Sequence, residues 1–247
     1  MTKAKATPKT EAVVRKPDGT ITFSLTISQN DVATTYTHVL TEVASTMELK
    51  GFRKGKAPIA MVEQSVDKSR LYSHVLEHVL PPAYAKVMTD KGLRPLVEPR
   101  VTPKSMEDGK DWEFAVETAG KPEIALGEYE KYLKDVKVEK TKEPEKAQDA
   151  KLTAIFDALL QHAKLEISPL LVDTEARAAL SKLVGQLNSL HLTVEDYAKS
   201  IKKTQDELVK DYQETAVTNL KLEFLLQAIA DEKKLARKAT LDYLLAL

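Results

Sequence analysis

The hydrophobic residues of this chain alternate with polar ones most clearly in one short run, and elsewhere they mostly recur every three or four positions. In that run, Ile21, Phe23, Leu25 and Ile27 are separated by threonine or serine, which is the pattern of a strand with one buried face. Beyond Pro144 the apolar residues show helical spacing only. This change of period predicts that strands are confined to the first part of the chain and that the second part is helical.

The strand signals of the first part indicate an antiparallel sheet. A Pro-Asp-Gly sequence at 17–19 lies between two short β-type runs and predicts a hairpin. The segments 93–104 and 112–119 are expected to form two more strands, and the prolines of the first favour an edge position. With helices between the two pairs, this order predicts an α+β domain over residues 11–132, after a flexible tail at 1–10.

Three helices are expected between these strands. The first is capped by Ser28 or Asn30 and ends at Gly51, a residue type that suits the position after a helix C-terminus. A short helix follows, and then a longer one from about Asp67, which the two prolines at 81–82 are expected to break or kink. The first two helices and the loop between them form a protruding helix-loop-helix in this prediction.

The chain changes character after the expected sheet and becomes highly charged. Residues 133–150 are expected to be a charged linker that ends in the start of a helix, and residues 151–247 an all-α domain with helical arms. A helix is expected to start near Ser168 and Pro169, and helix caps are expected at Thr193, Thr204 (with Glu207 in a capping box) and Thr240.

Composition limits the classes of function. The 37 lysines and arginines balance the 37 aspartates and glutamates, so any contact with nucleic acid has to be a local patch. The absence of cysteine excludes disulfides, cysteine-ligated zinc and thiol nucleophiles. Neither an apolar run of membrane-spanning length nor a secretory signal is present, so we expect a cytoplasmic protein without a membrane partner.

Motifs of catalysis and cofactor binding are nearly absent. The sequence contains no phosphate-binding loop, dinucleotide-binding or nucleophile-elbow pattern. His74, Glu77 and His78 match the H-x-x-E-H spacing of inverted zinc peptidases, but the two histidines are also expected on the polar side of an amphipathic helix. The second interpretation is favoured because the match is short and the domain is too small for a peptidase. We therefore expect no cofactor and no metal site.

The segment GFRKGKAP, residues 51–58, is the strongest candidate for a binding site because Phe52 stands among cations and between two glycines. The cations are Lys50, Arg53, Lys54 and Lys56. One interpretation is a helix connection whose phenylalanine lies in the core and whose cations are solvated. The other is a docking tip, in which the cations contact phosphates or acidic side chains and the phenylalanine enters a pocket as an anchor.

The same segment resembles the ribosome-docking signature of the trigger factor family, G-F-R-x-G-x-x-P. The stretches 80–99, 121–140, 166–175 and 207–216 also resemble that family, so the likeness covers most of the chain. It implies an ATP-independent chaperone that docks at the ribosomal exit tunnel and shields nascent or unfolded polypeptides. Contacts with a ribosomal protein and ribosomal RNA are implied for the signature residues Gly51, Phe52, Arg53, Lys54, Gly55, Lys56 and Pro58.

The chain departs from the family pattern in one respect. Trigger factors usually carry a peptidyl-prolyl isomerase domain after the segment that ends at residue 140, and the stretch before the next expected helix is too short for one. We therefore expect a minimal form that is not an enzyme, whose helical part cradles clients and permits weak self-association. The candidate client contacts are Leu171, Leu187, Leu190, Leu222, Leu226 and Leu244.

Two other interpretations stay open at this stage. One is a free cytoplasmic chaperone or assembly factor, or one related by fold to periplasmic chaperones such as SurA, that does not dock on ribosomes. The other is a residual prolyl isomerase. The intact signature and the absence of a signal segment favour the ribosome-associated chaperone.

Overall fold

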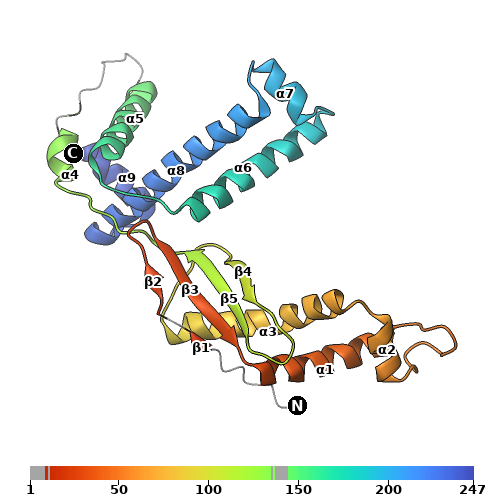
Figure 1. The fold of residues 1–247 in the computed structure, drawn as a ribbon. Helices are drawn as coiled ribbons and strands as arrows, with labels where there is room; N and C mark the ends of the chain where they lie inside the picture. The colour runs from red at the N-terminus through yellow and green to blue at the C-terminus, as the bar shows by residue number, and fades with distance from the viewer. Residues whose placement is uncertain (1–8, 11, 135, 137–143) are drawn as a thin grey trace. The chain divides into compact units, whose positions relative to one another are not determined.

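A computed structural model describes residues 9–10, 12–134, 136 and 144–247. The chain forms two compact units (Figure 1). The first takes in the chain up to Arg15 and Ile21–Thr118, and the second takes in Lys16–Thr20 and Ala119–Leu247. We expected the first domain to extend to residue 132. The division falls earlier, at Thr118, because the segment after it packs with helices of the second unit.

The sheet lies in the first part of the chain, as the change of period predicts. Its strands are Lys9–Thr10 (β1), Val14–Arg15 (β2), Thr20–Ile27 (β3), Arg100–Ser105 (β4) and Trp112–Ala119 (β5). Both β1 and β2 pair antiparallel with β3, β4 pairs antiparallel with β5, and the strand order is β1-β3-β5-β4. The hairpin between β2 and β3 is confirmed, and the backbone amide of Lys16 donates to the carbonyl of Thr20 across it at 2.9 Å.

Two expectations about the N-terminal and edge segments needed correction. The strand expected over 93–104 begins only at Arg100, because Pro95 and Pro99 have no amide hydrogen to donate to a neighbouring strand. Its position at the edge of the sheet is confirmed. The tail expected at 1–10 lies largely outside the described residues, but its last two residues form β1.

The helices of the first unit are Gln29–Thr46 (α1), Ile59–Ser65 (α2) and Lys68–Asp90 (α3). Ser28 caps α1 as expected, since its side chain accepts from the backbone amide of Asp31 at 3.2 Å. The expected end of α1 at Gly51 was wrong, because Met47 already leaves the helix with an extended backbone.

The break expected at the two prolines of α3 was also wrong, since the helix continues through Pro81 and Pro82. Both prolines lie on the exposed side of α3, opposite the buried face that carries Val75, Val79 and Ala83. The carbonyl groups that lose an amide partner therefore face solvent, where water satisfies them.

The core of the first unit lies between one face of the sheet and the helices α1 and α3. The alternating residues of β3 point into it, and so do Trp112 and Phe114 of β5 and Leu71 of α3, all of which are buried. Hydrophobic burial on this scale is the main term that holds such a unit together.

The second unit is helical. Its helices are Tyr129–Lys134 (α4), Pro144–His162 (α5), Pro169–Ser189 (α6), Val194–Ser200 (α7), Gln205–Lys233 (α8) and Arg237–Ala246 (α9). Helices α6 and α8 run side by side and α7 joins their far ends, which makes a helical arm (Figure 1). At the other end of α8, α4, α5 and α9 pack around a separate core that includes Leu159, Leu225 and Leu244.

The predicted caps at Thr193 and Thr204 are confirmed, since both form capping boxes, with the side chains of Asp196 and Glu207. The predicted helix start near Ser168 is also confirmed, although the Ser168 side chain makes no capping hydrogen bond. Thr240 does not cap a helix, because α9 begins three residues before it. Among the described residues, no helix combines the length and the apolarity that crossing a membrane requires.

Candidate docking site

The loop between α1 and α2, residues 47–58, consists mainly of two successive turns, and we call it the tip loop. The amide of Phe52 donates to the carbonyl of Leu49 at 2.9 Å, and the amide of Lys56 donates to that of Arg53 at 2.9 Å. Gly51 and Gly55 hold the third position of these turns with φ of 94° and 71°, a region that other residues rarely adopt. The four-residue spacing of the glycines therefore follows from two turns placed end to end.

The base of the tip loop is fixed to the first unit. The amide of Gly55 donates to the carbonyl of Met47 at 3.1 Å. A Cβ at Gly55 would lie 2.5 Å from the carbonyl oxygen of Ser45, so only glycine permits this close approach to the end of α1. Ala57 packs partly against the core, and Val62 of α2 is completely buried. The loop is thus anchored at both ends while its middle stays outside the core.

The functional side chains of the tip loop face solvent. Phe52 is 36% exposed, which rules out the interpretation in which it is tucked into the core. The cations Lys50, Arg53, Lys54 and Lys56 are exposed as well. Within the described parts of the chain, none of these four cations forms an ion pair. The loop therefore offers an aromatic ring beside positive charges that are free to meet an anion.

Two neighbours of the loop were missed by reasoning from the sequence. Ile59 and Met61, in the first turn of α2, are 47% and 43% exposed. The signal was present, because α2 carries three large apolar residues but is too short to bury more than Val62 well. With Phe52 they add apolar surface next to the cations, as an anchored interface requires.

The leucines predicted to contact clients are distributed unevenly. Leu171, Leu187 and Leu244 are buried in hydrophobic cores, so we correct their assignment: a buried side chain cannot meet a client while the unit stays folded. Leu222 and Leu226 are half-buried. Leu190, at the end of α6, is 67% exposed and is the one of the six that is available without rearrangement.

Five exposed apolar side chains belong to the far half of α6, to α8 near its start, and to the segments on either side of α7, and we call them the arm tip. Its members are Val184, Leu190, Leu192, Ile201 and Val209. The arm holds a small core of Leu183, Leu187 and Leu208, which uses only one face of each helix. The residues of the arm tip lie outside that core. Four of the five were missed by reasoning from the sequence, and for one of them, Val184, the reason is a helical spacing that assigns it to a core stripe.

The histidines considered as metal ligands point to different partners. His74 Nδ1 lies 3.3 Å from the carboxylate of Glu77 on the same helix, whereas His78 Nε2 lies 3.9 Å from Glu42 of α1. Both histidines have exposed side chains on the polar side of α3. In the described ranges, no group of three or more histidine, aspartate or glutamate side chains is arranged to hold a metal ion.

Comparison with known proteins identifies the family to which this chain belongs. A profile of bacterial trigger factor protein (TF) matches residues 10–159, and a profile of the TF C-terminus matches residues 128–239. The chain belongs to the trigger factor family. The tip loop lies inside the part matched by the first trigger factor profile, and the arm inside the part matched by the second.

Curated trigger factors match the chain over part of their length. That of Streptococcus mutans serotype c (strain ATCC 700610 / UA159) is 37% identical over 125 residues, 51% of this chain and 28% of the relative. That of Streptococcus suis (strain 05ZYH33) is 36% identical over 144 residues, 58% of this chain and 33% of the relative. The chain thus spans about a third of the length of these two relatives or less.

A solved structure was also found, from work titled "Promiscuous Substrate Recognition in Folding and Assembly Activities of the Trigger Factor Chaperone". It aligns with a TM-score of 0.39 and 16% identity, over 60% of this chain and 34% of that chain.

Proposed function

We propose that this chain is an ATP-independent chaperone that docks at the ribosomal exit tunnel and shields nascent polypeptides. The tip loop makes the contact with the ribosome, and the helical unit meets the client. The observation that carries this proposal is the exposure of Phe52 and of four cations, which form no ion pair with the described residues, on a loop whose base is fixed to the core. Membership of the trigger factor family supports the chaperone role.

Docking through the tip loop rests on two kinds of contact. Arg53 and Lys54 neutralise phosphates of ribosomal RNA, a term that weakens as salt concentration rises. Phe52, with Ile59 and Met61 beside it, inserts into an apolar depression of a ribosomal protein and supplies the anchor. The glycines and Pro58 set the shape of the loop, so their contribution is to positioning.

Client binding is assigned to the arm tip together with the half-buried Leu222 and Leu226. Charged residues surround these apolar side chains, for example Lys199, Lys202 and Lys203 around Ile201. Scattered apolar side chains of this kind bind many unfolded sequences weakly, while the charges between them limit self-aggregation. Weak self-association through the same surface is part of the proposal.

The proposal assigns no catalysis, no cofactor and a cytoplasmic location. Helix α4 ends at Lys134 and α5 begins at Pro144, so the chain between them is too short for an inserted isomerase domain. A free chaperone remains the alternative, because the arm tip would bind clients with or without the ribosome.

The test is a triple substitution, Phe52→Ala, Arg53→Ala and Lys54→Ala, assayed by co-sedimentation with purified ribosomes over a range of salt concentrations. We expect binding to weaken at least about tenfold, because an aromatic anchor and two cations are removed together. The matched control is Lys91→Ala, Arg94→Ala and Leu96→Ala, which removes two exposed cations and one exposed apolar residue elsewhere in the first unit.

The control triple should bind ribosomes as the unaltered protein does. Undiminished binding by the tip-loop triple would overturn the role of the loop and favour the free chaperone. Equal losses in both triples would mean that total charge, rather than the tip loop, drives the association.

A further inference from the structure

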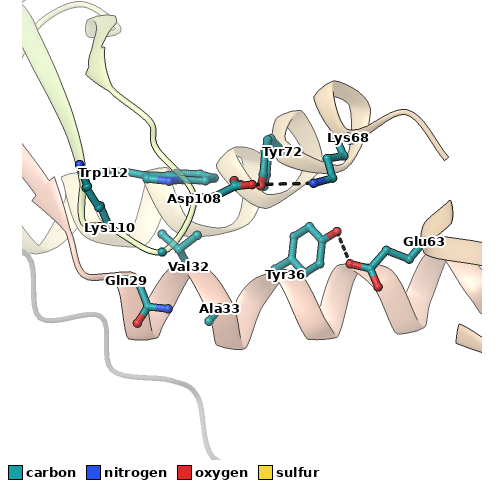
Figure 2. Close-up of a pocket in the computed structure, with 11 residues that line it drawn as sticks. Gln29, Val32, Ala33, Tyr36, Glu63, Lys68, Tyr72, Asp108, Lys110 and Trp112 are labelled. Atoms are coloured by element: carbon teal, nitrogen blue, oxygen red, sulfur yellow. Dashed lines mark hydrogen bonds and ion pairs between the residues drawn. The ribbon is translucent and has the colours of Figure 1, made fainter. Parts of the chain in front are cut away.

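A cavity of about 210 Å³ opens in the first unit between α1, α3 and the loop that joins β4 to β5. Figure 2 shows Tyr36 of α1, Tyr72 of α3 and Trp112 of β5 around it. The rings of Tyr36 and Tyr72 are 5.9 Å apart and tilted, and Trp112 meets Tyr72 edge-on at 5.4 Å. None of the residues that line this aromatic pocket belongs to the tip loop.

Two carboxylates flank the aromatic pocket, and each is held by a tyrosine. The hydroxyl of Tyr36 donates to Glu63 of α2 at 2.9 Å, and the hydroxyl of Tyr72 donates to Asp108. Burial, followed by these hydrogen bonds, raises the pKa of both phenols to about 12. The tyrosines therefore stay neutral donors near neutral pH, and each carboxylate keeps further lone pairs for a second donor.

The two lysines that line the pocket do not form strong ion pairs with Glu63 or Asp108. Lys68 Nζ is 3.8 Å from Asp108, and both side chains are largely exposed, so this ion pair is weak. Lys110 is paired with Glu107 instead. Among the described residues Glu63 has no cationic partner, only the tyrosine hydroxyl.

We propose that this aromatic pocket binds the guanidinium group of an arginine side chain on a partner peptide. A planar guanidinium stacks on the tyrosine rings and donates to a carboxylate with two parallel hydrogen bonds. The carboxylate of Glu63 can accept these two hydrogen bonds. A guanidinium that binds near Asp108 instead would displace Lys68, whose ion pair with Asp108 is weak. An anionic ligand is disfavoured, because the two lysines of the lining, Lys68 and Lys110, already pair with Asp108 and Glu107, whereas Glu63 and Asp108 would repel it.

This assignment is independent of the proposed docking role. The pocket would give the first unit a contact for basic segments of a polypeptide, separate from the apolar contacts of the arm tip. It stands or falls on the recognition of arginine, whether or not the tip loop binds ribosomes.

The chain supplies its own reporter, because Trp112 is its only tryptophan and lies in the pocket. We would titrate the full protein with acetyl-Gly-Arg-Gly-amide and with the same peptide carrying citrulline, a neutral isostere of arginine, and follow tryptophan fluorescence. We expect a saturable change with the arginine peptide, and at least roughly tenfold weaker binding of the citrulline peptide.

Two substitutions connect the signal to the pocket. Glu63→Gln keeps an acceptor for the tyrosine but removes the charge, and should weaken binding of the arginine peptide roughly tenfold. Glu98→Gln is the matched control, since Glu98 is exposed, lies outside the tip loop and does not line the pocket, and it should leave binding unchanged. The emission spectrum of each free variant reports whether the surroundings of Trp112 are intact.

Equal binding of the arginine and citrulline peptides would overturn the proposal, and so would undiminished binding to an intact Glu63→Gln variant. If the emission spectrum shows that Glu63→Gln disturbs the surroundings of Trp112, the variant Tyr36→Phe is used in its place. It keeps the aromatic ring but removes the hydrogen bond that holds Glu63. Unchanged arginine binding by that variant would also contradict the assignment. A fluorescence change that depends on protein concentration without peptide would identify a second copy as the occupant and overturn the peptide site.

Discussion

The conformation of the tip loop depends on single backbone positions. Gly51 and Gly55 both have positive φ, but only Gly55 is also enclosed, since a Cβ there would meet the carbonyl of Ser45 at 2.5 Å. At Gly51 nothing lies within 4 Å of that position. The two glycines therefore differ in physical role: one permits a turn, and the other permits both a turn and a close approach to α1.

The substitution Gly55→Ala should accordingly cost more stability than Gly51→Ala. We expect about 1–2 kcal/mol for Gly51→Ala, from left-handed strain alone, and about 2–4 kcal/mol for Gly55→Ala, where the clash is added. Urea unfolding followed by the fluorescence of Trp112, which lies in the core of the first unit, measures both. Equal losses of stability in the two variants would show that α1 yields to the added methyl group.

At the scale of elements, a polar cluster holds α4 to α8 and α9. Glu130 accepts hydrogen bonds of 2.6 Å from Lys233 and from the hydroxyl of Tyr243. The Lys233 ammonium lies over the rings of Tyr129 and Tyr243, at 5.8 and 5.6 Å from their centroids. The hydrogen bonds from Lys233 and Tyr243 lower the pKa of Glu130, and its carboxylate raises that of Lys233.

The cluster predicts a pH-dependent attachment of α4. A carboxyl whose pKa is lowered by folding stabilises the folded state above its unfolded pKa, here near 4.5, and loses that contribution as the pH falls further. In Glu130→Gln we expect faster hydrogen exchange of the α4 amides at neutral pH. The difference from the unaltered protein should shrink below pH 4.5, once intrinsic exchange rates are taken into account.

The control for this experiment is Glu128→Gln, which removes an exposed carboxylate that pairs with Lys131 only one turn away. It should leave the exchange of α4 nearly unchanged at every pH, because exposed pairs of this kind contribute little. A difference between Glu130→Gln and the unaltered protein that persists at low pH would mean that the charge of Glu130 is not what holds α4.

At the scale of the whole molecule, the proposed docking and client surfaces lie in different compact units. The tip loop belongs to the first unit and the arm tip to the second. Each unit has a core of its own, so a substitution on the surface of one should not disturb the other. The two activities are therefore expected to be separable.

Separation is tested by Leu190→Ala combined with Leu192→Ala. We expect this pair to weaken the suppression of aggregation of a denatured reporter protein about threefold to tenfold, since two exposed leucines lose their contact with clients. Ribosome binding should be unchanged, and stability should change by less than about 0.5 kcal/mol because both residues are exposed. The tip-loop triple should show the reverse pattern.

The matched control for the arm is Val14→Ala with Leu96→Ala, two exposed apolar residues of the first unit. It should leave the suppression of aggregation intact. Equal losses in the two pairs would contradict a localised client surface and indicate that any exposed apolar residue serves.

Local order in this protein is determined by the sequence to a large extent. The hairpin before β3 and the caps at Ser28, Thr193 and Thr204 depend on neighbours within a few positions. The hairpin and the caps at Thr193 and Thr204 were predicted, and Ser28 was one of the two residues predicted to cap α1. The glycine spacing of the tip loop belongs to the same class, because a turn is closed by residues three positions apart.

Only the tertiary structure shows which apolar residues are buried and which face solvent. Helical spacing identifies a face but not its partner, so Leu187 and Leu190 look alike in the sequence although one lies in the core of the arm and the other faces solvent. The aromatic pocket likewise depends on residues brought together from distant segments. The continuation of α3 depends on its prolines lying on the exposed side of the helix. Burial is a property of the neighbours that folding supplies, and periodicity alone does not specify them.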